Sequence, residues 1–258
     1  MGDFLDKILL GFKECAFRAG SILLREFKRD DLSYREKIER DFVSETDLKV
    51  EEEVRKVLEK KFRDIPFLGE EMGKDFIEEG FICDPLDGTR NFIQKIPFFS
   101  FSIAYVKEGE PLVSVIYIPF LNELFYAIKN RGAYLNDRLI KVSNKTSGFL
   151  IGTGFPFRRR EYWEIYYKKL KEVFENSDDL RRPGSASQDL AYVACGRYDG
   201  FFEFGLSPWD VIPGVLLVEE AGGKTSDMQG ERNHLRSGNI IAGNPIAYDF
   251  LLKIFKKN

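Results

Sequence analysis

Two carboxylates that could grip a hard cation stand three residues apart in the segment Asp84 to Thr89. The apolar residues before them predict a buried strand that ends at Cys83, and Pro85 prevents a helix from starting too early. Gly88 and Thr89 can then open a helix, whose free N–H groups and dipole attract a phosphate. Because a metal site and a phosphate site would lie side by side, the segment predicts phosphoryl chemistry. An ordinary Asp-Pro-Gly turn is the alternative for this segment taken alone.

Further acidic residues stand at the ends of other predicted elements. Glu70 follows a short apolar stretch, and Asp47 and Asp210 each lie where a helical pattern begins. If Glu70, Asp84, Asp87 and Asp210 shared one pocket, they would repel each other and a phosphate, so the set makes sense only with bound divalent cations. All of these ligand atoms are oxygen, which suits Mg²⁺, Mn²⁺ or Ca²⁺ rather than Zn²⁺.

These motifs together resemble the inositol monophosphatase family of magnesium-dependent, lithium-sensitive sugar phosphatases. Matching segments lie in order along most of the chain: GEE at 69–71, DPLDGTRNF at 84–92, GSA at 184–186, WD at 209–210 and AGGKTSD at 221–227. Several ordered motifs are far more specific than any one of them. The resemblance implies a layered α/β fold, the sugar phosphatase fold, with alternating helical and sheet layers and mixed or antiparallel sheets.

The resemblance also implies a role for each motif residue. Two or three Mg²⁺ ions, or Mn²⁺ as a substitute, would be held by Glu70, Asp84, the Leu86 carbonyl, Asp87 and Asp210. The catalytic residues would be Asp47 and Thr89, which activate the attacking water, together with Glu70. Contacts to the substrate would come from Gly88, Thr89, Gly184, Ser185, Ala186 and Glu203.

The predicted function is magnesium-dependent hydrolysis of a small sugar or polyol phosphate by two-metal-assisted in-line attack of water. Inositol 1-monophosphate is the first candidate substrate, and a fructose-1,6-bisphosphatase or a dual-specificity enzyme is the alternative. A covalent route in which Asp84 or Asp87 attacks phosphorus is a weaker reading. Two readings without catalysis stay open: a regulatory binding protein of a transcription complex, and a Ca²⁺ or Mg²⁺ binding module.

Several residues in these segments have a second interpretation. Ser185 and Gln188 fit a capping box, which would explain both as a helix start. Asp199 could contact a substrate hydroxyl in place of Glu203. Arginines at 90, 181 and 182 would each lie near the phosphate or pair with a neighbouring acid.

Composition agrees with a cytoplasmic enzyme of 258 residues, 43% hydrophobic and 31% charged. A net charge of −3 gives no reason to expect nucleic acid as a partner, and no apolar stretch approaches the roughly 18 residues that span a bilayer. Three cysteines in apolar settings indicate reduced core thiols. His234 is the only histidine, which argues against a Ser/His/Asp triad. The expected partners are a small phosphate ester and, by the resemblance, a second copy in a homodimer.

Hydrophobic periodicity predicts elements that would position these residues. Helices are expected near 3–28, 46–63, 160–175, 185–195, 209–221 and 245–256, and strands at 100–106, 112–118 and 123–128, followed by a further hairpin. We interpret the whole chain, 1–258, as one domain of two closely packed subdomains, roughly 1–145 and 146–258, with the metals between them.

Overall fold

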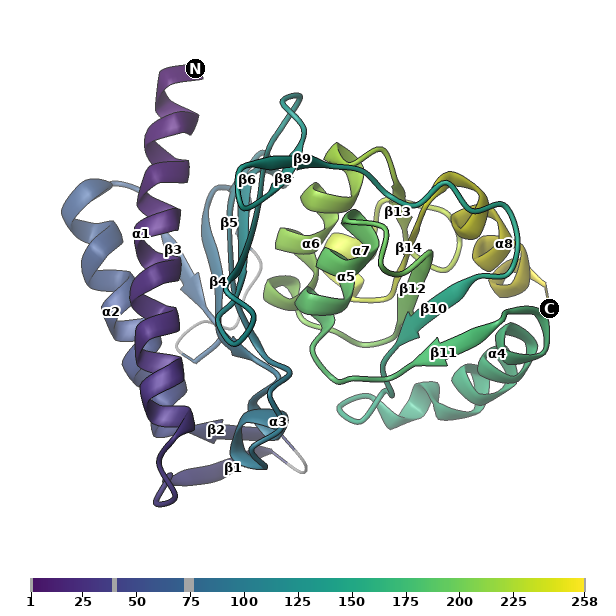
Figure 1. The fold of residues 1–258 in the computed structure, drawn as a ribbon, viewed down its shortest axis with the longest axis horizontal. Helices are drawn as coiled ribbons and strands as arrows, with labels where there is room; N and C mark the ends of the chain where they lie inside the picture. The colour runs from purple at the N-terminus through teal and green to yellow at the C-terminus, as the bar shows by residue number, and fades with distance from the viewer. Residues whose placement is uncertain (1, 39–40, 72–76, 258) are drawn as a thin grey trace.

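The chain folds into five alternating layers of helices and sheets in the computed structural model, which describes residues 2–38, 41–71 and 77–257 (Figure 1). The outer layer at the N-terminus holds α1 (Gly2–Phe27) and α2 (Glu45–Lys61). Helices α5 (Ala186–Ala194) and α6 (Pro208–Glu220) lie between the two sheets, and α4 (Trp163–Asn176) and α8 (Pro245–Lys256) cover the far face of the smaller sheet. The predicted layered α/β fold is therefore confirmed.

The larger sheet has seven strands in the order β3-β4-β5-β6-β7-β8-β9. Only β3 and β4 pair in parallel, and every later neighbour is antiparallel, as the predicted hairpin connections require. Its strands are β3 (Phe67–Gly69), β4 (Gly80–Asp87), β5 (Ser100–Lys107), β6 (Glu110–Ile118), β7 (Glu123–Ile128), β8 (Ala133–Leu135) and β9 (Arg138–Ile140).

The smaller sheet has five strands in the order β11-β10-β12-β14-β13. Strands β10, β11, β12 and β13 run in the same direction, and β14 is antiparallel to both of its neighbours. They are β10 (Leu150–Thr153), β11 (Asp179–Arg181), β12 (Gly200–Glu203), β13 (Lys224–Ser226) and β14 (Ile240–Gly243). The larger sheet thus ends before residue 145 and the smaller one begins after it, although α5 and α6 from the second half cover a face of the larger sheet.

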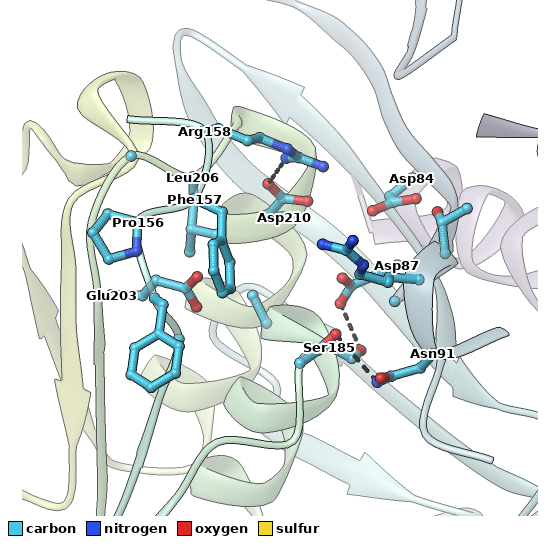
Figure 2. Close-up of a pocket in the computed structure, with 18 of the residues that line it drawn as sticks. Asp84, Asp87, Asn91, Pro156, Phe157, Arg158, Ser185, Glu203, Leu206 and Asp210 are labelled. Carbon is cyan, nitrogen blue, oxygen red and sulfur yellow. Dashed lines mark hydrogen bonds and ion pairs between the residues drawn. The ribbon is translucent and has the colours of Figure 1, made fainter. Parts of the chain in front are cut away.

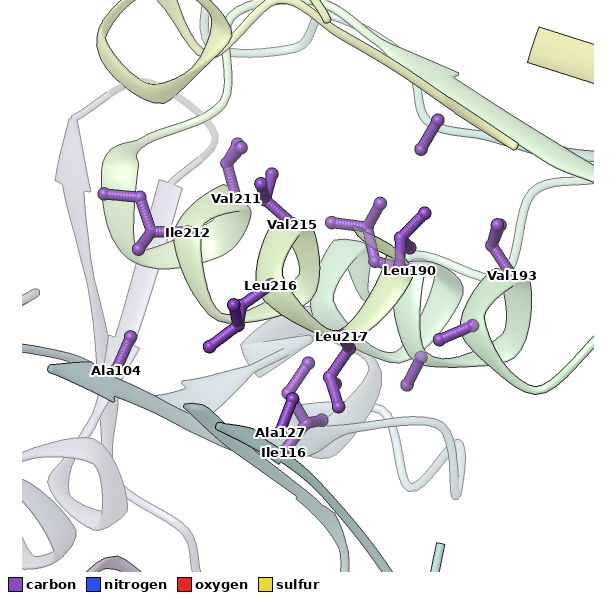
Figure 3. Packing of buried hydrophobic residues seen from close by; sticks show 14 of the residues in the cluster. Ala104, Ile116, Ala127, Leu190, Val193, Val211, Ile212, Val215, Leu216 and Leu217 are labelled. Carbon is purple, nitrogen blue, oxygen red and sulfur yellow. The ribbon is translucent and has the colours of Figure 1, made fainter. Parts of the chain in front are cut away.

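Helices cover both faces of the larger sheet. Because successive side chains of a strand point to opposite sides, each strand contributes residues to two cores. Phe81 and Ile103 belong to the core beneath α1 and α2, while their neighbours Ile82 and Ala104 belong to the core beneath α5 and α6. Figure 3 shows this second core, in which the α6 side chains lie over Ile116 and Ala127 of the sheet. A third core joins the smaller sheet to α4 and α8. The strands predicted at 100–128 therefore form core.

Some elements differ from the sequence prediction. The hairpin of β1 (Tyr34–Ile38) and β2 (Asp41–Ser44) was not predicted, because its charged sequence lacks an apolar alternation. A short 3-10 helix, η1 (Arg160–Tyr162), precedes α4, and two short helices, α3 (Thr89–Ile93) and α7 (His234–Ser237), complete the fold. The other expected helices lie within a few residues of their predicted ends. None of the helices among the described residues is long and apolar enough to cross a membrane.

We predict that Gly20→Ala destabilises the protein, although alanine favours a helix over glycine by about 1 kcal/mol. A Cβ at Gly20 would lie 2.3 Å from Cε1 of Tyr117, and the hydroxyl of that ring is held by Asn122 at 2.9 Å. Overpacking of this kind costs about 1–3 kcal/mol. Urea unfolding measures the change, with Ser21→Ala on the exposed face of α1 as a control that stays within about 0.5 kcal/mol of wild type. Equal stability of the Gly20 variant would contradict the close seating of α1 on β6.

Candidate active site

A bulge in β4 turns Asp84 and Asp87 toward the same space. Strand β4 does not end at Cys83, as predicted, but continues through Pro85 to Asp87. Its pairing with β5 shifts where Asp84 faces Ser102 and Asp87 faces Ser100, so three steps on one strand oppose two on the other. Residues three apart on a regular strand would point to opposite faces, and the extra residue removes that difference. Pro85 therefore lies within a strand and not, as predicted, at a helix start, and a strand tolerates proline at a bulge.

Three buried aspartates meet at this point. Ligand atoms of Asp84, Asp87 and Asp210 lie within 4.8 Å of one another, and the three residues are at most 8% exposed. Figure 2 shows their carboxylates pointing into one pocket. Burial, followed by the charges of Glu70, Asp87 and Asp210, raises the pKa of Asp84 well above its usual value. A bare cluster of charged carboxylates is therefore unfavourable here, and a bound cation or proton would relieve the repulsion.

Asp87 is fixed by the start of α5. Its Oδ2 accepts hydrogen bonds from the Ser185 hydroxyl at 2.7 Å, the Ser187 amide at 2.7 Å and the Ser187 hydroxyl at 2.6 Å. The predicted capping box is thus wrong, because Ser185 forms no side-chain cap and Gln188 instead donates to the Tyr192 hydroxyl. With one oxygen of Asp87 committed to these donors, the other is left to face the pocket.

Asp47 and Asp210 are both held at a helix start, three residues after a serine. The Ser44 amide donates to Asp47 Oδ2 at 2.9 Å, and the Ser207 amide donates to Asp210 Oδ2 at 2.8 Å. Each serine is the residue that precedes the first helical turn, where an acidic side chain satisfies an N–H group that lacks a helical partner. The same local pattern therefore places one carboxylate in the first turn of α2 and another in the first turn of α6.

Thr89 links the β4 bulge to α2. Its hydroxyl lies 3.0 Å from Asp47 Oδ1 and 2.9 Å from the Leu86 carbonyl. Gly88 precedes it with a φ of 91°, and a Cβ there would lie 2.9 Å from the Phe98 carbonyl oxygen, so only glycine fits. Helix α3 has five residues. The dipole of so short a helix is small, so the free N–H groups at its first turn are the feature that would attract an anion.

Glu70 reaches the pocket from the turn after β3. Arg158 joins it to the aspartates, with Nη2 3.8 Å from Glu70 Oε1 and Nη1 3.3 Å from Asp210 Oδ2. Glu70 is not within the group of three converging aspartates, although it lines the same pocket. Arg158 thus brings a positive charge from the protein into contact with this cluster.

Glu203 lies across the pocket from the aspartates, at the end of β12. Gly154 makes room for it, because a Cβ at that position would lie 2.1 Å from Glu203 Oε1. Burial raises the pKa of Glu203 to about 8, against a smaller opposite effect of Arg182. Asp199 lies elsewhere: it accepts from the Ser143 hydroxyl at 2.6 Å and the Leu150 amide at 2.7 Å, which indicates a structural role.

All predicted site residues except Asp47 line this one pocket, and Asp47 lies behind Thr89. The predicted residues in the lining are Glu70, Asp84, Leu86, Asp87, Gly88, Thr89, Gly184, Ser185, Ala186, Glu203 and Asp210. Arg90 and Arg182 also line it, whereas Arg181 pairs with Asp179. The pocket does not include His234, which is buried and donates to or accepts from Thr225.

Sequence reasoning missed the segment 154–158, which forms one wall of the pocket. It carries Phe155, Phe157 and Arg158 after the end of β10. Its only signal in the sequence is a Gly-Phe-Pro-Phe-Arg stretch that follows a short strand. Basic residues there resemble solvated surface unless the fold is known.

The residues present fit a divalent cation. The converging donors are buried carboxylate oxygens, and burial, followed by repulsion from Glu70, Asp87 and Asp210, holds the pKa of Asp84 high. Hard cations prefer such oxygen ligands, and a cation would remove the unbalanced charge. Asp84, Asp87 and Asp210 are the residues best placed to hold it, with Glu70 and the Leu86 carbonyl beside them.

The alternating helical and sheet layers match the fold of solved inositol monophosphatases, such as the IMPase of Thermotoga maritima, which superposes with a TM-score of 0.86 at 31% identity, covering 95% of this chain and 96% of that one. The sequence profile of the inositol monophosphatase family matches residues 5–258, and the chain belongs to that family.

Similar proteins carry two kinds of name. The chain is 43% identical over 246 residues to "Nus factor SuhB" of Pseudomonas aeruginosa, covering 91% of this chain and 90% of that protein. It is 39% identical over 260 residues to "Fructose-1,6-bisphosphatase/inositol-1-monophosphatase" of Aquifex aeolicus, covering 98% and 97%. The crystal structure of the extragenic suppressor protein suhB from Bartonella henselae superposes with a TM-score of 0.92 at 38% identity, covering 97% of this chain and 99% of that one. Family membership supports a phosphatase that depends on a divalent metal.

The raised pKa of Glu203 predicts how the stability of the metal-free protein depends on pH. An acid whose pKa is higher in the folded than in the unfolded state stabilises the fold at low pH. This stabilisation is lost as the pH rises through the pKa of the folded state, which is about 8 for Glu203. We expect Glu203→Gln to gain stability relative to wild type as the pH is raised from about 5 to 9. Urea unfolding in EDTA at several pH values measures this difference.

Glu164→Gln, an exposed acid on α4, is the matched control and should show no such trend. A constant difference between wild type and Glu203→Gln across this pH range would contradict the raised pKa.

Proposed function

We propose that this protein is a magnesium-dependent phosphomonoesterase that hydrolyses a small sugar or polyol phosphate, with inositol 1-monophosphate as its first substrate. The observation that carries the proposal is the convergence of Asp84, Asp87 and Asp210 beside the Thr89–Asp47 pair. A cation site alone would not require that pair. Family membership supports the same reaction class.

Glu70, Asp84, the Leu86 carbonyl, Asp87 and Asp210 would hold the metal. Bound Mg²⁺ ions would supply positive charge that offsets the carboxylates and would lower the pKa of water. Two or three ions, with Mn²⁺ as a substitute, and inhibition by Li⁺ are part of the proposal and rest on the family resemblance.

Thr89 and Asp47 would orient the attacking water. A threonine hydroxyl can donate one hydrogen bond. When Thr89 donates it to Asp47, the hydroxyl oxygen can accept a hydrogen bond from water. Because Asp47 is itself held by Ser44, its carboxylate keeps this orientation. The water would then attack phosphorus in line with the leaving oxygen, and no covalent phosphoenzyme is needed.

The opposite wall would bind the organic part of the substrate. Glu203 faces the pocket and can accept hydrogen bonds from hydroxyl groups of a polyol, while the backbone at Gly184, Ser185 and Ala186 allows close approach. Asn91 holds that backbone, since its side-chain amide donates to the carbonyl oxygens of Pro183 at 2.9 Å and Gly184 at 3.4 Å.

We propose a cytoplasmic homodimer, in line with the family resemblance. The cysteines Cys15, Cys83 and Cys195 are free thiols, as expected in a reducing compartment.

We predict that Asp84→Asn abolishes phosphate release. The substitution removes one charge from the centre of the carboxylate cluster, and even residues that only support metal ligands change activity by about 10- to 100-fold, so the loss should be at least about a hundredfold. Release of inorganic phosphate from inositol 1-monophosphate with Mg²⁺ is the measurement. Asp249→Asn, an exposed acid that pairs with Lys224, is the matched control and should keep wild-type activity. Activity that persists in the Asp84 variant would overturn the proposed function.

A regulatory role in a transcription complex is the alternative of another class. It is supported by the name "Nus factor SuhB" that the relatives carry. The same assay separates the two, because a purely regulatory protein would release no phosphate in the wild-type form with Mg²⁺.

Arg182 favours a bisphosphate as a second candidate substrate. Its guanidinium lies 5.2 Å and 5.1 Å from the ring centres of Phe155 and Phe157, at the pocket lining. Among the residues that the structure describes, Arg182 makes no ion pair with a carboxylate. A cation held in this way between aromatic rings is suited to an anionic group of the substrate, such as the second phosphate of fructose 1,6-bisphosphate.

We predict that Arg182→Gln separates the two substrates. Because a hydrogen bond to a charged group is worth about 1.5–3 kcal/mol, kcat/KM for fructose 1,6-bisphosphate should fall at least about tenfold, while the value for inositol 1-monophosphate changes by less than about threefold. Arg181→Gln, an exposed neighbour paired with Asp179, is the control and should leave both values unchanged. An equal loss for both substrates would reject the second-phosphate role and leave the hydrolytic function standing.

A further inference from the structure

We propose that Glu51, which lies outside the pocket, is a positioning residue that fixes how Glu70 reaches the metal centre. Glu51 stands in α2 one helical turn after Asp47, and it is 1% exposed. Buried carboxylates are costly unless they are hydrogen-bonded or paired, so its partners indicate its role. The inference rests on the proposed function of Glu70 as a metal ligand.

The turn that carries Glu70 is held from two sides. Its own amide donates to the Cys83 carbonyl at 3.1 Å, which ties it to β4. The next amide, that of Glu71, donates to Glu51 Oε2 at 2.9 Å, which ties it to α2. The peptide groups on both sides of Glu70 are therefore fixed, and they set the point and direction from which its side chain leaves the backbone.

Gly69 shows independently that the Glu51 carboxylate packs against this turn. A Cβ at Gly69 would lie 2.3 Å from Cδ and Oε2 of Glu51 and 2.6 Å from Oε1. No larger residue fits without moving either the carboxylate or the turn. Arg55 approaches the carboxylate from the helix, with Nη2 3.7 Å from Oε1, and its guanidinium lies over the Phe67 ring at 4.6 Å.

Helix α2 thereby supports two parts of the site with two acids on one face. Asp47 holds Thr89, and Glu51, four residues later, holds the turn of Glu70. Residues that orient metal ligands from behind typically change metal affinity by about 10- to 100-fold when they are removed. Glu51 should therefore affect metal binding more than the stability of the fold.

The test measures binding of Mg²⁺ and of Mn²⁺ to the metal-free protein by isothermal titration calorimetry, without substrate. Glu51→Met keeps the volume but removes the acceptor, and it should weaken binding by about 10- to 100-fold. Glu51→Gln keeps an oxygen that can accept from the Glu71 amide, and it should stay within about threefold of wild type. Glu52→Met on the exposed face of α2, where Glu52 pairs with Lys56, is the control and should bind as wild type does.

Two further variants keep the outcome decisive. Gly69→Ala should weaken binding in the wild-type background but add no further loss in Glu51→Ala, where the clashing carboxylate is gone. Wild-type affinity in Glu51→Met, or equal losses in the Met and Gln variants, would overturn the positioning role. If Glu51→Met does not fold, unchanged affinity in Gly69→Ala would overturn it instead. Glu70→Gln distinguishes failure of the ligand role of Glu70 from failure of the positioning role of Glu51. Unchanged metal binding in that variant would reject Glu70 as a ligand, whatever the Glu51 variants show.

Discussion

Mutual repulsion between buried carboxylates is the constraint on which the rest of this structure depends. Asp84, Asp87 and Asp210 lie within 4.8 Å of one another, with Glu70 nearby, and burial strengthens their repulsion. To hold them there, other groups must fix each carboxylate, and a bound cation or a proton must offset the repulsion. Arg158 supplies part of the positive charge from within the protein. The fold can therefore be understood as a frame that holds like charges together.

The frame uses a different device for each acid. A strand bulge aligns Asp84 with Asp87, serines at the start of α5 fix Asp87, and the first turn of α6 fixes Asp210. These elements come from different layers: β4 lies in the larger sheet, and α5 and α6 lie between the sheets. The packing of those helices on the sheet, with its continuous apolar core, thus sets the distances in the pocket. The contacts that stabilise the fold therefore also position the acids of the candidate metal site.

Several local features were predictable from the sequence because they depend on neighbours along the chain. The helical and strand periods gave α1, α2 and β5–β7, since apolar spacing follows directly from which face is buried. The errors also have local causes. The hairpin β1–β2 has no apolar alternation. Ser185 fits a capping box in sequence, yet its hydroxyl donates to Asp87, a residue far away in the chain, and forms no cap.

The sequence by itself determined the acidic residue types of the candidate site and the family to which the chain belongs, because ordered motifs and hydrophobic periods are properties of the linear chain. Only the tertiary structure decided that Asp84 and Asp87 face one way, that Arg158 enters the cluster and that Glu51 braces the turn of Glu70. These depend on strand register and on contacts between residues far apart in the chain. Such contacts form only when the layers pack, so no local pattern records them.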